Sequence, residues 1–185
     1  MSSGRRYGGP FPAEHPPVIT IEIANEQSHV PLEDGRLRDA VRIVLERESV
    51  ARARISLAVV DDPTIRRVHR EYLEEDEPTD VLSFLLDRSE DGREGEVIVS
   101  GQTAASAAPA YGWTPEDELL LYVIHGALHL TGGDDSTPEA REAMRRREQA
   151  HLARFGVTGR YDLLDREARP LESADRPPRG NRKEP

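Results

Sequence analysis

Apolar residues alternate with polar ones in some stretches of the chain and recur at helical spacing in others. Alternating or continuous apolar stretches, rich in β-branched residues, predict strands at 18–23, 54–60, 80–86 and 96–100. Spacings of three and four residues predict one helix after Asp34 and another that starts at Asp61 or Asp62, before Pro63. This succession is typical of an α/β sheet with helical crossovers.

The last two predicted strands, 80–86 and 96–100, are joined by a short connection with a turn at Glu90–Arg93. A connection this short leaves no room for a helical crossover, so we expect an antiparallel hairpin. The sequence thus predicts a single α/β domain over residues 17–158, with a mixed four-stranded sheet and helices packed on it.

Further helical segments follow the last strand. A helix or turn covers Gln102–Tyr111, and Thr114 with Asp117 forms a capping box for a long helix that ends near Leu130. A second capping box at Ser136–Glu139 opens a last helix, which runs to about Phe155. Trp113 precedes the first of these caps, and we expect it to pack against the long helix.

The two ends of the chain lack helical or strand periodicity. Residues 1–16 are rich in Gly, Ser and Pro, and residues 159–185 are charged and rich in Pro. We therefore expect a disordered N-terminal arm at 1–16 and a disordered charged tail at 159–185.

Composition narrows the cellular setting. The chain has no cysteine, which excludes disulfides and thiolate ligands and suits a reducing compartment. The longest apolar run is Leu119–Ile124, far short of the roughly 20 residues that cross a bilayer. The basic residues at the start are followed by Gly and Pro instead of the apolar stretch of a signal peptide. We expect a cytoplasmic protein that makes no membrane contact.

The net charge of -10 argues against general nucleic-acid binding, because an acidic surface repels a polyanion. Positive charge is nevertheless uneven, with Arg145, Arg146 and Arg147 in succession and several basic residues near the C-terminus. The three arginines form either a solvated helix face or part of a local basic surface. RNA binding requires such a surface, or a metal ion that supplies the charge.

The residues most suggestive of chemistry lie at 123–135, in the sequence VIHGALHLTGGDD. On a helix, His125 and His129 project from the same face one turn apart, so their imidazoles can bind one metal ion. Without further ligands, this pair is equally typical of an ordinary surface or core helix. Two or three protein ligands with a position left for water are typical of a catalytic metal site.

A third ligand is expected just beyond this helix. Gly132 and Gly133 end the helix and allow a left-handed turn that reverses the chain. The turn can bring the carboxylate of Asp135, or that of Asp134, back toward the histidines. From the residues alone, either aspartate can be the third ligand.

The sequence HGALHLTGGDD at 125–135 resembles the HGxLHLxGxDH signature of the YbeY family of endoribonucleases. Residues 78–84 (PTDVLSF) are similar to a second element of that family, and residues 95–100 (GEVIVS) to its strand before the site. Met144 and Glu148 fall where the last helix of the family has a Met and a Glu. The resemblance covers about residues 18–156, in the same order and spacing.

The resemblance implies a single-strand-specific, metal-dependent endoribonuclease that acts in 16S rRNA 3′-end maturation and ribosome quality control. It implies one Zn²⁺ at His125, His129 and Asp135, with a water on that ion as the nucleophile. The proton acceptor stays unknown, with Asp80, Asp134 and Arg70 as candidates for support. The implied partners are RNA, the small ribosomal subunit and assembly factors, with no DNA.

Two residues depart from the family pattern. Asp135 stands where the family has a third histidine. Aspartate binds zinc through oxygen, but its charge weakens the ion as a Lewis acid and favours a harder ion such as Mn²⁺. Alternatively, the site has lost its metal. Leu73 stands where many relatives carry an arginine, and Arg70, one turn earlier, is a candidate substitute.

Two other functions stay open at this point. A metalloprotease of the zincin type needs a glutamate directly after the first histidine, and Gly126 occupies that position. A non-catalytic ribosome-assembly factor with a weakened or structural metal site fits the acidic composition and both departures.

Four other polar residues lie in or near the elements that carry the resemblance. His69 lies on an apolar helix stripe and is expected to be a hydrogen-bonded core histidine. Thr79 and Ser83 belong to the element that lies beside the metal pocket in the family. Asp80 either orients a ligand histidine or caps the turn before its strand.

Overall fold

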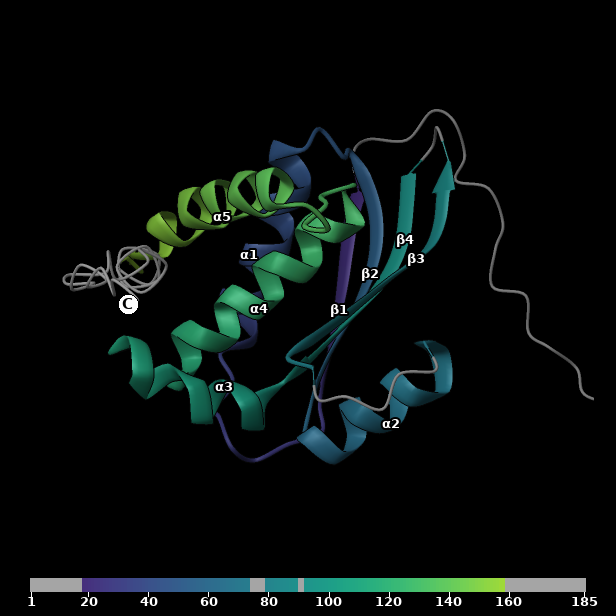
Figure 1. Cartoon of the computed structure of the whole chain (residues 1–185). Helices are drawn as coiled ribbons and strands as arrows, with labels where there is room; N and C mark the ends of the chain where they lie inside the picture. Colours follow the sequence, from purple (N-terminus) through teal and green to yellow (C-terminus); the bar gives the residue numbers. More distant parts are fainter. Residues whose placement is uncertain (1–17, 74–78, 90–91, 159–185) are drawn as a thin grey trace, which may run out of the picture.

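Strands β1 (Val18–Asn25), β2 (Arg52–Val60), β4 (Gly92–Ser100) and β3 (Val81–Ser89) lie side by side in that order in a computed structural model (Figure 1). The first three are parallel, and β3 is antiparallel to β4 at the edge. The structure describes residues 18–73, 79–89 and 92–158. The predicted arm at 1–16 and tail at 159–185 lie outside these residues. The predicted α/β class with a mixed four-stranded sheet is confirmed.

Helices cover the two faces of the sheet unequally. Helix α1 (Asp34–Arg47) crosses from β1 to β2 and, with α4 (Pro115–Leu130), covers one face, while α2 (Asp62–Leu73) lies on the other (Figure 1). The larger core lies between the sheet and the helices α1 and α4, and includes Val41, Leu57, Val97 and Leu120. A smaller cluster of Val60, Ile65, Leu82 and Ile98 holds α2 to the opposite face. These contacts follow from the alternation of side chains along β2 and β4.

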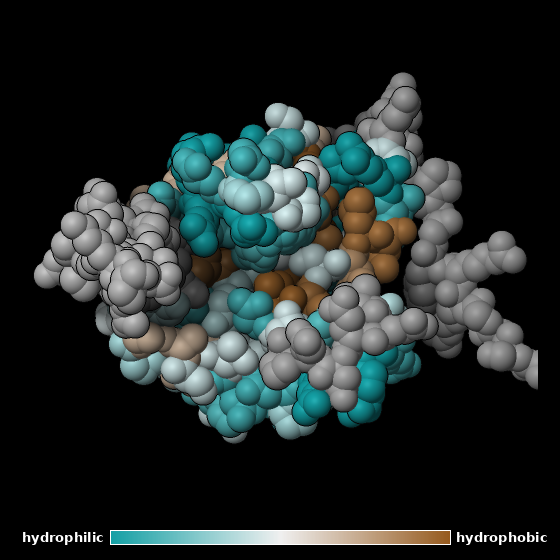
Figure 2. Space-filling view, in the orientation of Figure 1, coloured by the Kyte–Doolittle hydropathy of each residue, from teal (hydrophilic) through white to brown (hydrophobic). Residues whose placement is uncertain are grey.

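The predicted hairpin of β3 and β4 is confirmed, but both strands are longer than the sequence indicated. Pairing continues to Ser89 and Gly92, and a register shift lies between Leu85 and Asp87. The extra residues of β3 are exposed, so backbone hydrogen bonds hold them without apolar side chains. Figure 2 shows a mostly hydrophilic face with hydrophobic residues near the β3 edge, where Leu85 and Leu86 are exposed.

The segment Gln102–Tyr111 is helical, as α3 (Gly101–Ala107) and a 3₁₀ turn (Ala108–Tyr111). Helix α4 then begins where predicted, because the hydroxyl of Thr114 accepts a hydrogen bond of 3.2 Å from the Asp117 backbone N–H. Trp113 packs partly buried against the main core. Its indole N–H donates to the carbonyl of Thr158 at 3.0 Å.

Helix α5 (Pro138–Leu152) is followed by a 3₁₀ turn at Ala153–Phe155, and its cap lies one residue later than predicted. The capping side chain is Thr137, which accepts from the Ala140 N–H at 3.1 Å. Ser136 instead donates its hydroxyl to Asp134 at 2.8 Å. Among the described residues, no helix is both long enough and apolar enough to cross a membrane.

Candidate metal centre

His125 and His129 project from the same side of α4, one turn apart. Their Nε2 atoms lie 2.9 Å from each other. The rings meet at 70°, with centroids 4.6 Å apart. The two nitrogen atoms therefore share one small volume, as a common ion requires.

The turn after α4 brings Asp135 back to this volume. Gly132 has a φ of +96°, which a side chain would disfavour, and the Gly133 N–H donates to the Leu128 carbonyl at 2.9 Å. Asp135 then lies with Oδ2 3.7 Å from Nε2 of His125 and Oδ1 3.7 Å from Nε2 of His129.

The donor set suits a divalent ion. Tetrahedral zinc with bonds near 2.0–2.1 Å separates its ligand atoms by about 3.3 Å. The separations of 2.9 and 3.7 Å bracket that value. One ligand atom from each of His125, His129 and Asp135 lies within 4.8 Å of the others. The three side chains can thus hold a metal ion.

Asp134, the other candidate carboxylate, turns toward its own loop. Its Oδ1 accepts from the Ser136 backbone N–H at 3.0 Å, and its Oδ2 accepts from the Ser136 hydroxyl at 2.8 Å. The hydrogen bond from the Ser136 backbone, followed by that from its side chain, lowers the pKa of Asp134. The structure therefore brings Asp135, and not Asp134, to the two histidines.

Glu148 on α5 holds the ring of His125 from behind. Its Oε1 lies 2.6 Å from Nδ1 of His125, and the glutamate is only 3% exposed. With the Nδ1 proton donated to this carboxylate, Nε2 keeps its lone pair for an ion. In the sequence, Glu148 stands out only as a position shared with the resembled family, and no role follows from it. The sequence offers one indication of such a role: Glu148 is an acidic residue one helical turn after Met144, which is buried.

The two histidines have opposite protonation tendencies. Burial lowers the pKa of His125, but the hydrogen bond and charge of Glu148 outweigh it, so the pKa is raised overall. Burial, and then the charge of neighbouring His125, lower the pKa of His129. His129 thus favours the neutral form that binds metals, while His125 depends on Glu148 for its orientation.

Helix α4 packs tightly against the sheet at Gly126, between the two histidines. A Cβ at this position would lie 2.6 Å from Cγ1 of Val97 and 3.0 Å from Oγ of Ser83. The Ser83 hydroxyl donates to the Gly126 carbonyl at 3.2 Å. No side chain fits here without movement of the sheet, so the glutamate of a zincin protease has no place.

The remaining candidate residues lie before β3 and on α2. Asp80 is half-buried before β3, and its charge raises the pKa of His125, but less than Glu148 does. The Thr79 hydroxyl donates to the Val81 carbonyl at 3.1 Å. His69 is buried on α2, as expected. Leu73 is the last residue of α2, and its side chain lies outside the described part of the chain.

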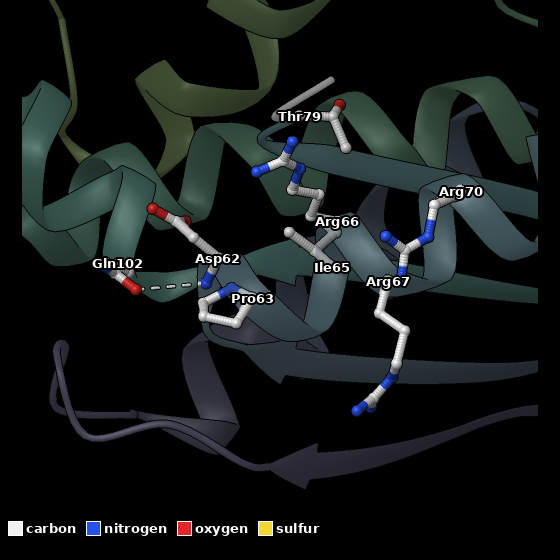
Figure 3. Close-up of a pocket in the computed structure, with 8 residues that line it drawn as sticks. All are labelled: Asp62, Pro63, Ile65, Arg66, Arg67, Arg70, Thr79 and Gln102. Atoms are coloured by element: carbon white, nitrogen blue, oxygen red, sulfur yellow. Dashed lines mark hydrogen bonds between the residues drawn. The ribbon is translucent and has the colours of Figure 1, made fainter. Parts of the chain in front are cut away.

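Two arginines of α5 form ion pairs. Arg147 pairs with Glu48 at 2.8 Å, and Arg146 pairs with Glu142 one turn earlier. These pairs favour the interpretation of a solvated helix face. Arginines of α2, including Arg70, line a pocket beside that helix (Figure 3).

Comparison with known proteins gives a consistent result. The sequence model of the family described as endoribonuclease YbeY matches residues 22–156. A protein of that name from Salinibacter ruber is 36% identical over 150 residues, covering 77% of this chain and 94% of the relative. Another from Pelotomaculum thermopropionicum is 37% identical over 151 residues, covering 76% and 99%. One from Rhodopirellula baltica is 43% identical over 112 residues, covering 60% of this chain and 58% of that longer relative.

Proposed function

This chain belongs to the YbeY family of endoribonucleases, and on that premise we propose that it hydrolyses phosphodiester bonds in single-stranded RNA with one divalent ion. His125, His129 and Asp135 are the proposed ligands. The observation that carries the proposal is the convergence of these three side chains, with separations of 2.9 to 3.7 Å between their donor atoms.

The ion and the residues around it have distinct tasks in this proposal. A bound divalent ion would supply a Lewis acid that polarises the phosphate and makes water a better nucleophile. Glu148 fixes the ring of His125 so that Nε2 faces the shared volume. Asp135 contributes an anionic oxygen, which reduces the net positive charge of the site. An oxygen ligand in place of a third histidine also makes the preference for Zn²⁺ over Mn²⁺ weaker.

The proposed substrate is ribosomal RNA near the 3′ end of the small-subunit molecule. The proposed setting is the cytoplasm, with the small ribosomal subunit and its assembly factors as partners and ribosome quality control as the broader task. Asp80 is a proposed supporting residue, because its charge acts on His125.

Metal content of the purified protein tests the site. Inductively coupled plasma mass spectrometry should find about one equivalent of metal in the wild type. The metal should be lost in Asp135→Ala and retained in Asp135→His. A labelled single-stranded RNA should be cleaved by the wild type and by Asp135→His, and not by Asp135→Ala. A wild type without metal, together with a metal-bearing Asp135→His variant, would reject the nuclease proposal.

The second candidate is a ribosome-assembly factor that acts by binding alone, favoured by the net charge of -10 and by the aspartate at position 135. Its distinguishing experiment is co-sedimentation with small ribosomal subunits. Binding that is unchanged in a His125→Ala/His129→Ala double variant, without RNA cleavage by the wild type, would favour it over the nuclease.

A further inference from the structure

The outer part of the β3–β4 hairpin contains two pairs of like charges. The strand register places Asp87 opposite Glu94 and Arg88 opposite Arg93. Side chains that face each other across an antiparallel pair have Cβ atoms about 4.5–5.5 Å apart, and like charges at that separation destabilise the sheet. Exchanging the residues at 93 and 94 would place each acid opposite an arginine. The stability of the hairpin therefore does not explain the order of these charges.

The two pairs lie on different faces of the sheet. Gly95 faces α4, because a Cβ at this position would lie 2.9 Å from Cδ2 of Leu130. Side chains alternate along a strand, so Arg93 and its partner Arg88 lie on this face, and Glu94 lies on the face of α2. The arginine pair is thus on the side of the sheet that α4 and the candidate metal centre occupy.

The arginine pair has no acidic partner in the described part of the chain. Glu94, from the acidic pair, lies 3.6 Å from Arg54 on β2. Within residues 18–73, 79–89 and 92–158, no carboxylate forms an ion pair with Arg88 or Arg93. Arg88 is exposed, and Nε of Arg93 is buried without a hydrogen-bond partner. Packing of its stem, and not an acid, therefore holds Arg93 opposite Arg88.

The arginine pair lies just beyond the helical turn that carries His129. Figure 1 shows the C-terminal end of α4 and the outer end of the hairpin at the same end of the sheet. Leu130, which follows His129, packs over Gly95. Arg93 is two residues further along β4, a distance of about 7 Å at the usual rise of a strand. An extended ligand at the histidines can therefore reach the arginine pair.

The chemistry of the pair suits a phosphate. Guanidinium groups present planar forks of donors that match phosphate oxygens, and a phosphate between two arginines offsets their mutual repulsion. In a chain with a net charge of -10, a polyanion is attracted only where positive charge is concentrated locally.

We propose that Arg88 and Arg93 together bind a backbone phosphate of the RNA strand, close to the cleaved bond but outside it. The proposal rests on the proposed function, since this strand is the substrate of the metal centre. It places the local basic surface that RNA binding requires at the end of the β3–β4 hairpin.

RNA affinity tests the pair directly. The test variant is Arg88→Gln/Arg93→Gln, and the control is Arg42→Gln/Arg145→Gln, which removes the same charge from exposed positions on α1 and α5. Fluorescence anisotropy with a labelled single-stranded RNA of about 12 nucleotides, in EDTA, measures binding without the metal. Loss of the charged hydrogen bonds should weaken binding about tenfold in the test variant and much less in the control. The slope of log K against log salt should become shallower by about 0.7 for one lost phosphate contact.

Urea unfolding gives a second measurement that a structural role would not reproduce. Arg88→Gln alone should leave the urea midpoint unchanged or raise it, because it removes the like charge opposite Arg93. The same variant should bind RNA more weakly. A lower midpoint in Arg88→Gln would show that Arg88 stabilises the hairpin and would overturn the proposal.

The remaining outcomes separate the proposal from its alternatives. RNA affinity in the test variant equal to that of the wild type, or an equal loss in the control, would overturn the phosphate site. Binding that depends on the two arginines, without cleavage by the wild type, would reject the nuclease and retain the site. Poly-aspartate that competes as strongly as unlabelled RNA would overturn the RNA site in favour of an acidic protein segment.

Discussion

Nδ1 of His125 lies 2.6 Å from Oε1 of Glu148, so a contact between α4 and α5 sets the orientation of a candidate metal ligand. Such a hydrogen bond fixes the tautomer and raises the basicity of the nitrogen that faces the ion. The proposed metal site therefore depends on Glu148, which lies 23 residues along the chain from the histidine that it orients.

Glu148→Gln should lower zinc affinity between about tenfold and 100-fold, because the neutral amide keeps the volume but loses the charge that holds the Nδ1 proton. Competition with a chromophoric chelator measures the change. Glu142→Gln is the matched control, since Glu142 lies on the same helix, exposed and paired with Arg146. Unchanged affinity in Glu148→Gln would show that His125 is oriented without the carboxylate.

Gly126→Ala should destabilise the fold by about 1–3 kcal/mol, since the new methyl group overlaps Val97 and Ser83. Gly35→Ala is the control. Gly35 also lies in a helix, nothing lies within 4 Å of its virtual Cβ, and the change should stabilise by about 0.5–1 kcal/mol. Urea unfolding monitored by circular dichroism measures both. Equal effects of the two substitutions would mean that the α4–sheet contact is looser than the distances indicate.

The free energy of unfolding should fall as pH decreases from 7.5 toward 5, in part through His151. This histidine is 3% exposed, and burial, followed by the charge of Arg47, lowers its pKa. Below its ordinary pKa of 6.5, the unfolded chain binds a proton that the native chain resists, so protonation favours unfolding.

The contribution of His151 is isolated by comparison with His151→Gln in EDTA, where the decrease in stability should be smaller. His125 acts in the opposite direction because its pKa is raised: its stabilisation is present below 6.5 and is lost as pH rises through the raised value. Because His125 is present in both the wild type and His151→Gln, its contribution cancels when their free energies of unfolding are subtracted. Parallel pH profiles of the wild type and the variant would contradict the assignment to His151.

Thr137→Ala should destabilise the protein by about 1 kcal/mol, because its hydroxyl caps the first turn of α5. Ser136→Ala should cost less, since the Ser136 hydroxyl donates to Asp134 within an exposed loop and does not cap the helix. Thermal unfolding of the two variants gives the comparison, and a larger loss in Ser136→Ala would place the cap at Ser136, as the sequence pattern suggested.

Sequence patterns over a few residues predicted the features of the candidate site that depend on neighbours in the chain. The spacing of His125 and His129, and the glycines after them, determine that an aspartate returns to the histidines. The choice between Asp134 and Asp135 depended on a hydrogen bond to Ser136. The same serine was a plausible cap from sequence, because Ser136 and Thr137 are both good capping residues and the pattern does not order them.

Features that depend on which helices and strands pack together could not be predicted from such patterns. Glu148 meets His125 only because α5 lies on α4, and no periodicity records which residue of one helix faces another. The outer parts of β3 and β4 contain polar residues such as Arg88 and Arg93, which pair across the hairpin. Strands are detected in a sequence by their apolar side chains, so these polar segments were missed.

The close contact at Gly126 limits how this protein can diversify. A zincin protease differs from it at this position by a glutamate, which the genetic code reaches from glycine in a single step. Here that step would force the side chain against Val97 and Ser83, and the sheet beneath α4 would have to be rebuilt first. A shared pair of histidines is therefore not enough to exchange one site for the other, because the glutamate itself conflicts with the packing of α4 on the sheet.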